Sequence, residues 1–204
     1  MRTLLIAATE PDPTRPGAGF SPPCPPVEAS ELAQAALDQT AATARSVGAD
    51  RLAVVLDPGS PLTVDGLETL RPEADEEDER VAASLATCDG PTLVVRSRTP
   101  QVTAAQLHDA FEALDGPYGD ALVGLTVDES WWALGLATPD PMALLGLPLR
   151  GAGSGTHLLD RVHGLGLALG LADRLLAAER FDDAVAIAQQ IPDTDFAARV
   201  EGLR

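Results

Sequence analysis

"GDALVGLTVDESWWALGL", residues 119–136, holds two short apolar runs, Ala121 to Leu125 and Trp131 to Leu136, with only five residues between them. Short apolar runs bounded by Gly, Asp or Ser are typical of buried β-strands. A parallel pair needs a crossover of about a dozen residues or more, so these two strands are expected to form an antiparallel or out-of-register pair late in the sheet.

Outside this segment, short apolar runs alternate with longer amphipathic stretches. Further strands are expected over residues 2–8, 51–57 and 92–96. Helical periodicity covers residues 27–47, 73–86, 103–114, 154–167, 182–190 and 194–203, with Thr103 as a plausible N-cap. This order predicts a mostly parallel sheet, because parallel neighbours need crossover connections. We expect an α/β three-layer sandwich with helices on both faces, and the length favours a single domain over residues 1–204.

The composition excludes several classes of protein. The chain has 14 basic residues, all of them arginine, against 31 acidic ones, for a net charge of -17. Such a charge gives little attraction for nucleic acid or anionic membranes, and the lack of lysine excludes Schiff-base chemistry and a P-loop. No apolar run is long enough for a secretion signal or a membrane span, and two cysteines without metal spacing favour a cytoplasmic protein.

Three segments have a composition that ligand sites can have. Residues 9–26 are rich in Pro and Gly and stand where a dinucleotide site would have a tight Gly-x-Gly-x-x-Gly turn, which argues against binding of NAD or FAD. A connection of this length is either a functional loop or a surface excursion. Residues 150–162, "RGAGSGTHLLDRV", are either an anion-binding helix start or a flexible joint. The acidic run at residues 73–79 is expected to be the solvated first turn of a helix and not a metal site.

Other catalytic and metal patterns find no support. His157 and His163 are six residues apart, which does not place them on one helix face as a zinc pair. No Gly-x-Ser-x-Gly elbow follows a strand, so a Ser-His-Asp triad is not indicated either.

Arg96 and Arg98 end the apolar run of "VVRSRTPQVT", residues 94–103. If the strand continues to Arg98, the two side chains lie on the same side of it, because they are two residues apart. Ligands of open α/β sheets gather at the carboxyl ends of strands. The two arginines therefore form either an anion site or a pair of solvated strand-end charges.

Trp131 and Trp132 are the chain's two tryptophans. Neighbouring side chains of a strand point to opposite faces, so one indole should enter the core, and the other should line the pocket or pack under a covering helix. The pair would then anchor the strand beside Asp128.

The runs "TPQVTAAQLHDAFEAL" (residues 99–114) and "GDALVGLTVDESWWALGLATPDP" (residues 119–141) resemble a bacterial family of small glycosyltransferase-like proteins. Residues 4–26, 164–170 and 181–197 fit the same pattern, so the likeness spans nearly the whole chain. It implies the GT-A fold of nucleotide-diphospho-sugar transferases. The family has Asp-Gly-Gly before paired aromatics; Asp128 matches the aspartate, and Glu129 and Ser130 replace the glycines.

The chain departs from the family at the positions that the resemblance assigns to nucleotide and metal. The Lys-Thr-Arg signature of the first loop becomes "PGAGF", with Arg15 as the nearby cation. The Gly-x-Asp-Thr-Pro motif becomes Arg96 to Pro100, so arginine stands where the resemblance implies a metal-binding aspartate, and the late Asp-x-Asp becomes Phe181-Asp182-Asp183. Replacing that carboxylate by a guanidinium changes the local charge by two units, and one unit charge at 4 Å contributes about 4 kcal/mol at an effective dielectric near 20. A divalent cation would be strongly disfavoured there, so we expect no metal cofactor.

Two hypotheses follow from this resemblance. In the first, a metal-independent transferase-like protein binds a nucleotide sugar through Arg15, Arg96, Arg98, Thr99 and Trp132. The arginines would neutralise the diphosphate, and Asp128 would be the base for an acceptor hydroxyl. In the second, the scaffold has lost the reaction and serves as a binding or assembly partner.

Overall fold

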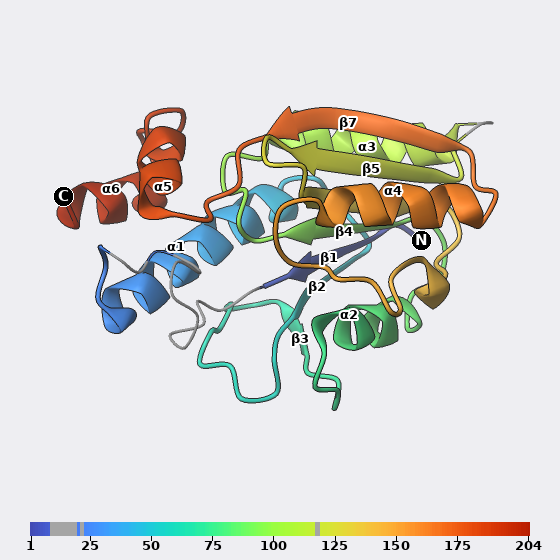
Figure 1. Cartoon of the computed structure of the whole chain (residues 1–204), viewed down its shortest axis with the longest axis horizontal. Helices are drawn as coiled ribbons and strands as arrows, with labels where there is room; N and C mark the ends of the chain where they lie inside the picture. Colours follow the sequence, from blue (N-terminus) through green and yellow to red (C-terminus); the bar gives the residue numbers. More distant parts are fainter. Residues whose placement is uncertain (9–19, 21–22, 117–118) are drawn as a thin grey trace.

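A computed structural model describes residues 1–8, 20, 23–116 and 119–204, and its centre is one sheet of seven strands (Figure 1). The strands are β1 (Thr3–Ala7), β2 (Arg51–Val55), β3 (Glu68–Leu70), β4 (Thr92–Arg96), β5 (Ala121–Thr126), β6 (Trp131–Leu136) and β7 (Leu169–Leu175). Their order across the sheet is β3-β2-β1-β4-β6-β5-β7.

Strand β6 runs antiparallel to both of its neighbours, β4 and β5, and the other neighbouring pairs are parallel. The antiparallel pairing predicted from the five-residue connection is therefore confirmed. The β5–β6 register shifts between Gly124 and Leu125. This irregularity lies next to the turn that carries Asp128.

Helices cover both faces of the sheet, which confirms the three-layer α/β architecture (Figure 1). The helices are α1 (Pro26–Arg45), α2 (Glu77–Leu85), α3 (Ala104–Asp115), the 3-10 turn η1 (Pro141–Ala143), α4 (Ser154–Gly164), α5 (Phe181–Ala188) and α6 (Asp195–Gly202). One core cluster joins α1 and α3 to the sheet, and another joins α2, η1 and α4 to its opposite face. A third cluster packs α5 and α6 against α1.

Local sequence explains why these elements form where they do. The residues of β1, β4, β5 and β6 are buried throughout, as expected for short apolar strands covered on both faces. Helix α3 begins after Thr103, whose side chain accepts a hydrogen bond from the Gln106 backbone in a capping box, so the predicted N-cap is confirmed. No helix in the described part of the chain combines the length and apolar character needed to cross a bilayer.

The two edge strands, β3 and β7, were not predicted from the sequence. In β7, exposed and half-buried side chains are mixed, and Leu171 is 66% exposed. Edge strands are covered less than central ones, so their residues do not form an apolar run. The predicted helix over residues 73–86 also begins later, at Glu77.

The two tryptophans lie on opposite faces of β6, as the alternation of a strand predicts, and both are fully buried. Trp131 faces the α2–α4 side, where its indole Nε1 donates to the Leu149 carbonyl at 3.1 Å. Trp132 faces the α1–α3 side, where its Nε1 donates to the Asp173 carbonyl at 2.9 Å. Both indoles therefore combine apolar burial with a satisfied N–H group.

Candidate functional site

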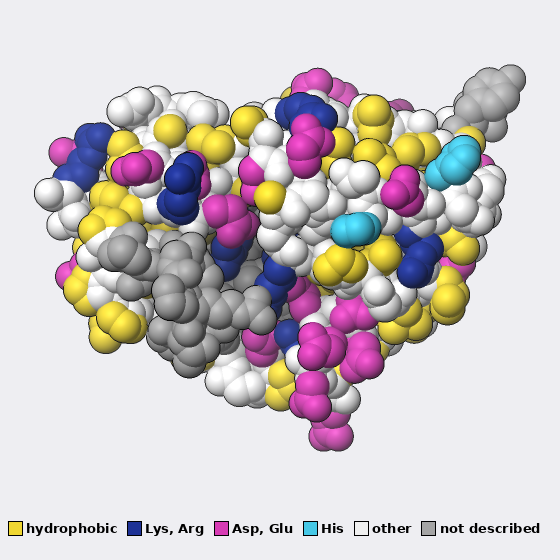
Figure 2. Space-filling model, viewed as in Figure 1, with side chains coloured by type: hydrophobic (Ala, Val, Ile, Leu, Met, Phe, Trp, Pro, Cys, Tyr) yellow, Lys and Arg dark blue, Asp and Glu magenta, His cyan; other side chains and the backbone are white. Residues whose placement is uncertain are grey.

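Charged side chains gather at the carboxyl edge of the sheet. Strands β1, β2, β4, β5 and β7 run in one direction, so their carboxyl ends meet at the same edge (Figure 1). Basic and acidic side chains lie side by side near the middle of the molecular surface in Figure 2. Ligands of open α/β sheets bind at this edge, so it is the first place to look for a site.

Arg96 is the last residue of β4 and points to the α2–α4 face. Its guanidinium donates to the Leu149 carbonyl and lies 5.2 Å from the centre of the Trp131 ring. Its Nη2 also forms an ion pair with Glu77 Oε1 at 3.2 Å. Since Arg96 is 5% exposed, these contacts hold the guanidinium almost entirely inside the protein.

Glu77 is held between two arginines. Its Oε2 accepts a hydrogen bond from Arg150 Nε at 2.6 Å, while its Oε1 faces Arg96. Burial alone would raise the pKa of the Glu77 carboxyl, but Arg96, Arg150 and Arg98 outweigh that effect and lower the pKa to about 2. Glu77 is therefore ionised and joins α2, β4 and the loop before α4.

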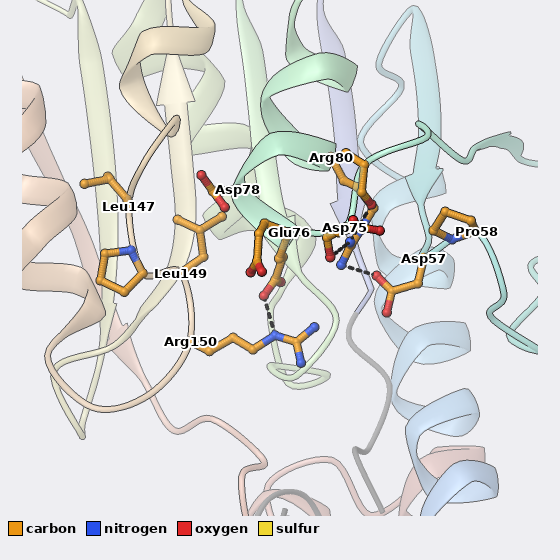
Figure 3. A pocket seen from close by; sticks show the side chains of 12 residues that line it. Asp57, Pro58, Asp75, Glu76, Asp78, Arg80, Leu147, Leu149 and Arg150 are labelled. Carbon is orange, nitrogen blue, oxygen red and sulfur yellow. Dashed lines mark hydrogen bonds and ion pairs between the residues drawn. The ribbon is translucent and has the colours of Figure 1, made fainter. Parts of the chain in front are cut away.

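Beside this group lies a cleft of about 690 Å³ (Figure 3). Arg150 stands at one side of it, and the dashed line from Arg150 marks the ion pair with Glu77. On the other side Arg80 pairs with Asp57 and donates to the Asp75 carbonyl at 2.6 Å. The cleft is lined by Asp57, Pro58, Ala74, Asp75, Glu76, Glu77, Asp78, Arg80, Leu147, Pro148, Leu149 and Arg150.

Arg98 forms an ion pair with Glu179 in the loop between β7 and α5. The same loop is fixed by the Ala178 backbone, which donates to the Arg98 carbonyl at 2.8 Å. Burial lowers the pKa of the Arg98 guanidinium, while the charge of Glu179 opposes that effect. The ion pair thus ties the end of β4 to the segment before α5.

The acid that faces Arg98 lies just before the late acidic motif, Phe181-Asp182-Asp183. Asp183 accepts a hydrogen bond from the Arg180 backbone at 2.9 Å and so closes the first turn of α5. Asp182 also lies in that first turn. Glu179, which precedes the helix, is the carboxylate that contacts the β4 end.

Asp128 lies in the turn between β5 and β6, at the same edge of the sheet. Its Oδ1 accepts hydrogen bonds from the Thr126 hydroxyl at 2.5 Å and the Ser130 hydroxyl at 3.0 Å. Burial would raise the pKa of Asp128, but these hydrogen bonds prevail and lower it. The carboxylate holds the turn together, and a lowered pKa makes it a weaker base.

Three other predicted site residues have different surroundings. Thr99 is buried, and its hydroxyl donates to the Arg96 carbonyl at 3.2 Å, so it supports the turn after β4. Trp132 is 0% exposed and gives a ligand no surface to contact, so its placement in a nucleotide-sugar site is corrected. Arg15 lies outside the described residues.

The start of α4 does not offer the free N–H groups of an anion site. The Ser154 and Thr156 amides donate to the Gly151 and Gly153 carbonyls at 3.2 and 3.0 Å. The Gly155 amide donates to the Glu129 carbonyl at 3.0 Å, and a Cβ at Gly155 would lie 2.7 Å from the Ser130 carbonyl oxygen. Residues 154–156 therefore join α4 tightly to the β5–β6 turn, which argues against the anion-binding alternative.

The residues at the β4 end do not fit a divalent cation. Arg96 and Arg98 occupy the Gly and Asp positions of the Gly-x-Asp-Thr-Pro motif. Within the described ranges, no three His, Cys, Asp or Glu side chains form a group suited to a metal ion. Hard cations such as Mg²⁺ need oxygen ligands, whereas a guanidinium provides only N–H donors.

Glu77, Arg80, Arg150 and Glu179 were not identified from the sequence. The helical phase of α2 is a signal for the first two of them. Glu77 and Arg80 share the helical phase of Val81, Ser84 and Leu85, which is the buried face of α2. A carboxylate in that phase should lie toward the sheet rather than toward solvent.

The ionised state of Glu77 predicts a pH dependence of stability. A glutamate with its pKa lowered from 4.5 to about 2 stabilises the folded state fully above pH 5, and this stabilisation is lost as the pH falls from 4.5 towards 2. Its size is on the order of 3 kcal/mol. Urea unfolding between pH 2 and 6 should show the advantage of the wild type over Glu77→Gln shrinking by that amount at low pH. A difference that stays constant over this range would contradict the prediction.

No protein-family model and no curated protein matches the sequence. Solved structures do match: the architecture is that of nucleotide-diphospho-sugar transferase-like proteins, as the resemblance implied.

A candidate nucleotide-diphospho-sugar transferase from Desulfovibrio desulfuricans G20 superposes with a TM-score of 0.83 at 13% identity, over 98% of this chain and 94% of that one. The CMP:2-keto-3-deoxy-manno-octonic acid synthetase complexed with CTP gives a TM-score of 0.62 at 8% identity, over 94% and 99%. Rv0371c from Mycobacterium tuberculosis H37Rv, in complex with manganese, gives 0.55 at 15% identity, over 92% and 97%. At such identities the likeness concerns the fold.

Proposed function

We propose that this chain is a glycosyltransferase-like protein that binds a nucleotide sugar at the carboxyl edge of its sheet without a divalent cation. Arg98 takes the place of the cation in this proposal. A guanidinium is permanently charged and can bind two phosphate oxygens at once. The diphosphate of a nucleotide sugar is the group that such a fixed positive charge would neutralise.

The ion pair between Arg98 and Glu179 is the observation that carries the proposal. It joins the β4 end, which matches the family's metal motif, to the loop just before Phe181-Asp182-Asp183, the counterpart of the late Asp-x-Asp motif. A salt bridge therefore holds Arg98 at the position to which the resemblance assigns a metal-binding aspartate. The related fold of the CMP:2-keto-3-deoxy-manno-octonic acid synthetase was solved with CTP, which supports a nucleotide as the ligand class.

Transfer itself is proposed to be slow or lost. Asp128 is the candidate base for an acceptor hydroxyl, because it is ionised and lies at the same edge of the sheet. The hydrogen bonds from Thr126 and Ser130 that lower its pKa also reduce its ability to take a proton.

The second candidate function is a non-catalytic scaffold that serves as a binding or assembly partner. The observation that favours it is that the guanidinium groups at this edge are already paired with protein carboxylates. A ligand phosphate would have to replace at least one of those carboxylates. The scaffold alternative predicts no affinity for nucleotide sugars.

A thermal-shift experiment separates the two candidates. UDP-, GDP- and CMP-linked sugars are added to the protein with EDTA or with manganese chloride. We expect one nucleotide class to raise the melting temperature equally well in EDTA, since a ligand at 100 times its Kd adds about 2.7 kcal/mol of stability. Arg98→Ala should abolish this shift.

The matched control is Arg204→Ala, which removes the same charge from a half-exposed side chain after α6 and should leave the shift intact. No shift with any nucleotide sugar would support the scaffold instead. Strong stabilisation by manganese alone would contradict the cation-independent site.

A further inference from the structure

We propose that Glu77 is an internal occupant of a phosphate site: its carboxylate holds the place that a phosphate or diphosphate group would take between Arg96 and Arg150. This deepens the proposed function and rests on it for the chemical class of the ligand. In this arrangement the protein restrains its own cleft, because a ligand must displace Glu77 before both arginines can bind it.

The geometry of the carboxylate supports this role. Oε1 of Glu77 faces Arg96 Nη2 at 3.2 Å, and Oε2 faces Arg150 Nε at 2.6 Å. The two arginines come from different elements, the end of β4 and the loop before α4, and converge on one anion. Carboxylate and phosphate present similar oxygen acceptors to guanidinium groups, so one can replace the other.

The Arg96 guanidinium is held in place by contacts that do not involve Glu77. Arg96 donates to the Leu149 carbonyl and stacks over Trp131. The same Leu149 carbonyl accepts a hydrogen bond from the Trp131 indole at 3.1 Å, which fixes the residue immediately before Arg150. Arg96 and the backbone before Arg150 would therefore stay in place when the carboxylate moves away, which favours binding of a replacement anion.

Glu77 is also placed where it can be exchanged for a ligand. It lines the cleft of about 690 Å³ together with Arg150, so an anion in the cleft can reach the pair from solvent. Arg98 adds a third positive charge close enough to act on Glu77 electrostatically. An anion that displaced Glu77 would meet the guanidinium of Arg96 at the end of β4 and that of Arg150 in the loop before α4.

The test measures binding of inorganic pyrophosphate to the full chain by isothermal titration calorimetry in EDTA. Glu77→Gln keeps the size of the side chain and removes its charge. We expect this variant to bind pyrophosphate at least 10-fold more tightly than the wild type. The matched control is Glu76→Gln, because Glu76 lines the same cleft, is exposed and carries the same charge.

A gain limited to Glu77→Gln, and lost again when Arg150→Gln is added, supports the proposal. An equal gain in Glu76→Gln would show a general charge effect and overturn it, as would no gain in either variant. If Glu77→Gln does not fold, Glu77→Asp replaces it, because its carboxylate is retracted by one methylene. Tighter pyrophosphate binding than in the wild type and in Glu76→Gln then supports the proposal, and no such gain overturns it.

The result is distinguishable from a failure of the proposed function. A wild type that binds no nucleotide sugar, with tight pyrophosphate binding by Glu77→Gln, leaves the internal occupant in place and removes the nucleotide-sugar proposal. If the wild type binds nucleotide sugars and Glu77→Gln shows no gain in pyrophosphate affinity, the nucleotide-sugar proposal stays and the internal occupant is removed.

Discussion

Trp132→Ala is expected to lower the free energy of unfolding by about 3–5 kcal/mol, the range measured when large buried aromatic side chains are truncated. The indole is fully buried on the α1–α3 face of β6 and lies against Gly124, where a Cβ would approach the ring to 2.4 Å. Truncation leaves a cavity there and also leaves the Asp173 carbonyl without its indole donor. Urea unfolding measured at pH 7 gives the difference directly.

The control for this prediction is Leu171→Ala, on the exposed face of the edge strand β7. Leu171 is 66% exposed, so its truncation should change stability by less than about 0.5 kcal/mol. A loss below 1 kcal/mol for Trp132→Ala would mean that the core beneath β6 is packed differently from the structure described above.

The strand pairing and the two faces of β6 were predictable because they depend on short-range rules. The connection between β5 and β6 is too short for a crossover, and alternation alone sends Trp131 and Trp132 to opposite sides. Strand β7 was not predicted because its residues do not form a buried apolar run. Leu169 and Leu171 lie at a sheet edge and are partly exposed. Its place in the sheet depends on pairing with β5, a long-range event.

The contacts of the site were harder to predict because they join distant parts of the chain. Glu77 and Arg150 are 73 residues apart, and Arg98 and Glu179 are 81 residues apart. In the sequence, Glu77 is one acid in a run of similar ones, and only its helical phase separates it from its exposed neighbours. Arg96 and Arg98 were identifiable as strand-end cations, but their carboxylate partners were not.

Arg98→Asp should make nucleotide-sugar binding depend on a divalent cation. The substitution changes the local charge by two units, and each unit at 4 Å contributes about 4 kcal/mol at an effective dielectric near 20. Without a cation the affinity should therefore fall by about 1000-fold or more. Manganese should restore part of it, because the introduced carboxylate, Glu179 and the ligand phosphates together form the oxygen ligand set that such cations accept.

The same substitution should also lower stability in the absence of ligand. It removes the ion pair with Glu179 and places two carboxylates together, at a cost of about 2 kcal/mol, below that of a fully buried pair because Glu179 is partly exposed. The double variant Arg98→Asp with Glu179→Arg reverses the pair and should regain most of this stability without manganese. If Arg98→Asp and the wild type bind the nucleotide sugar with equal affinity in EDTA, Arg98 is not part of the binding site. The non-catalytic scaffold would then be the better proposal for the function.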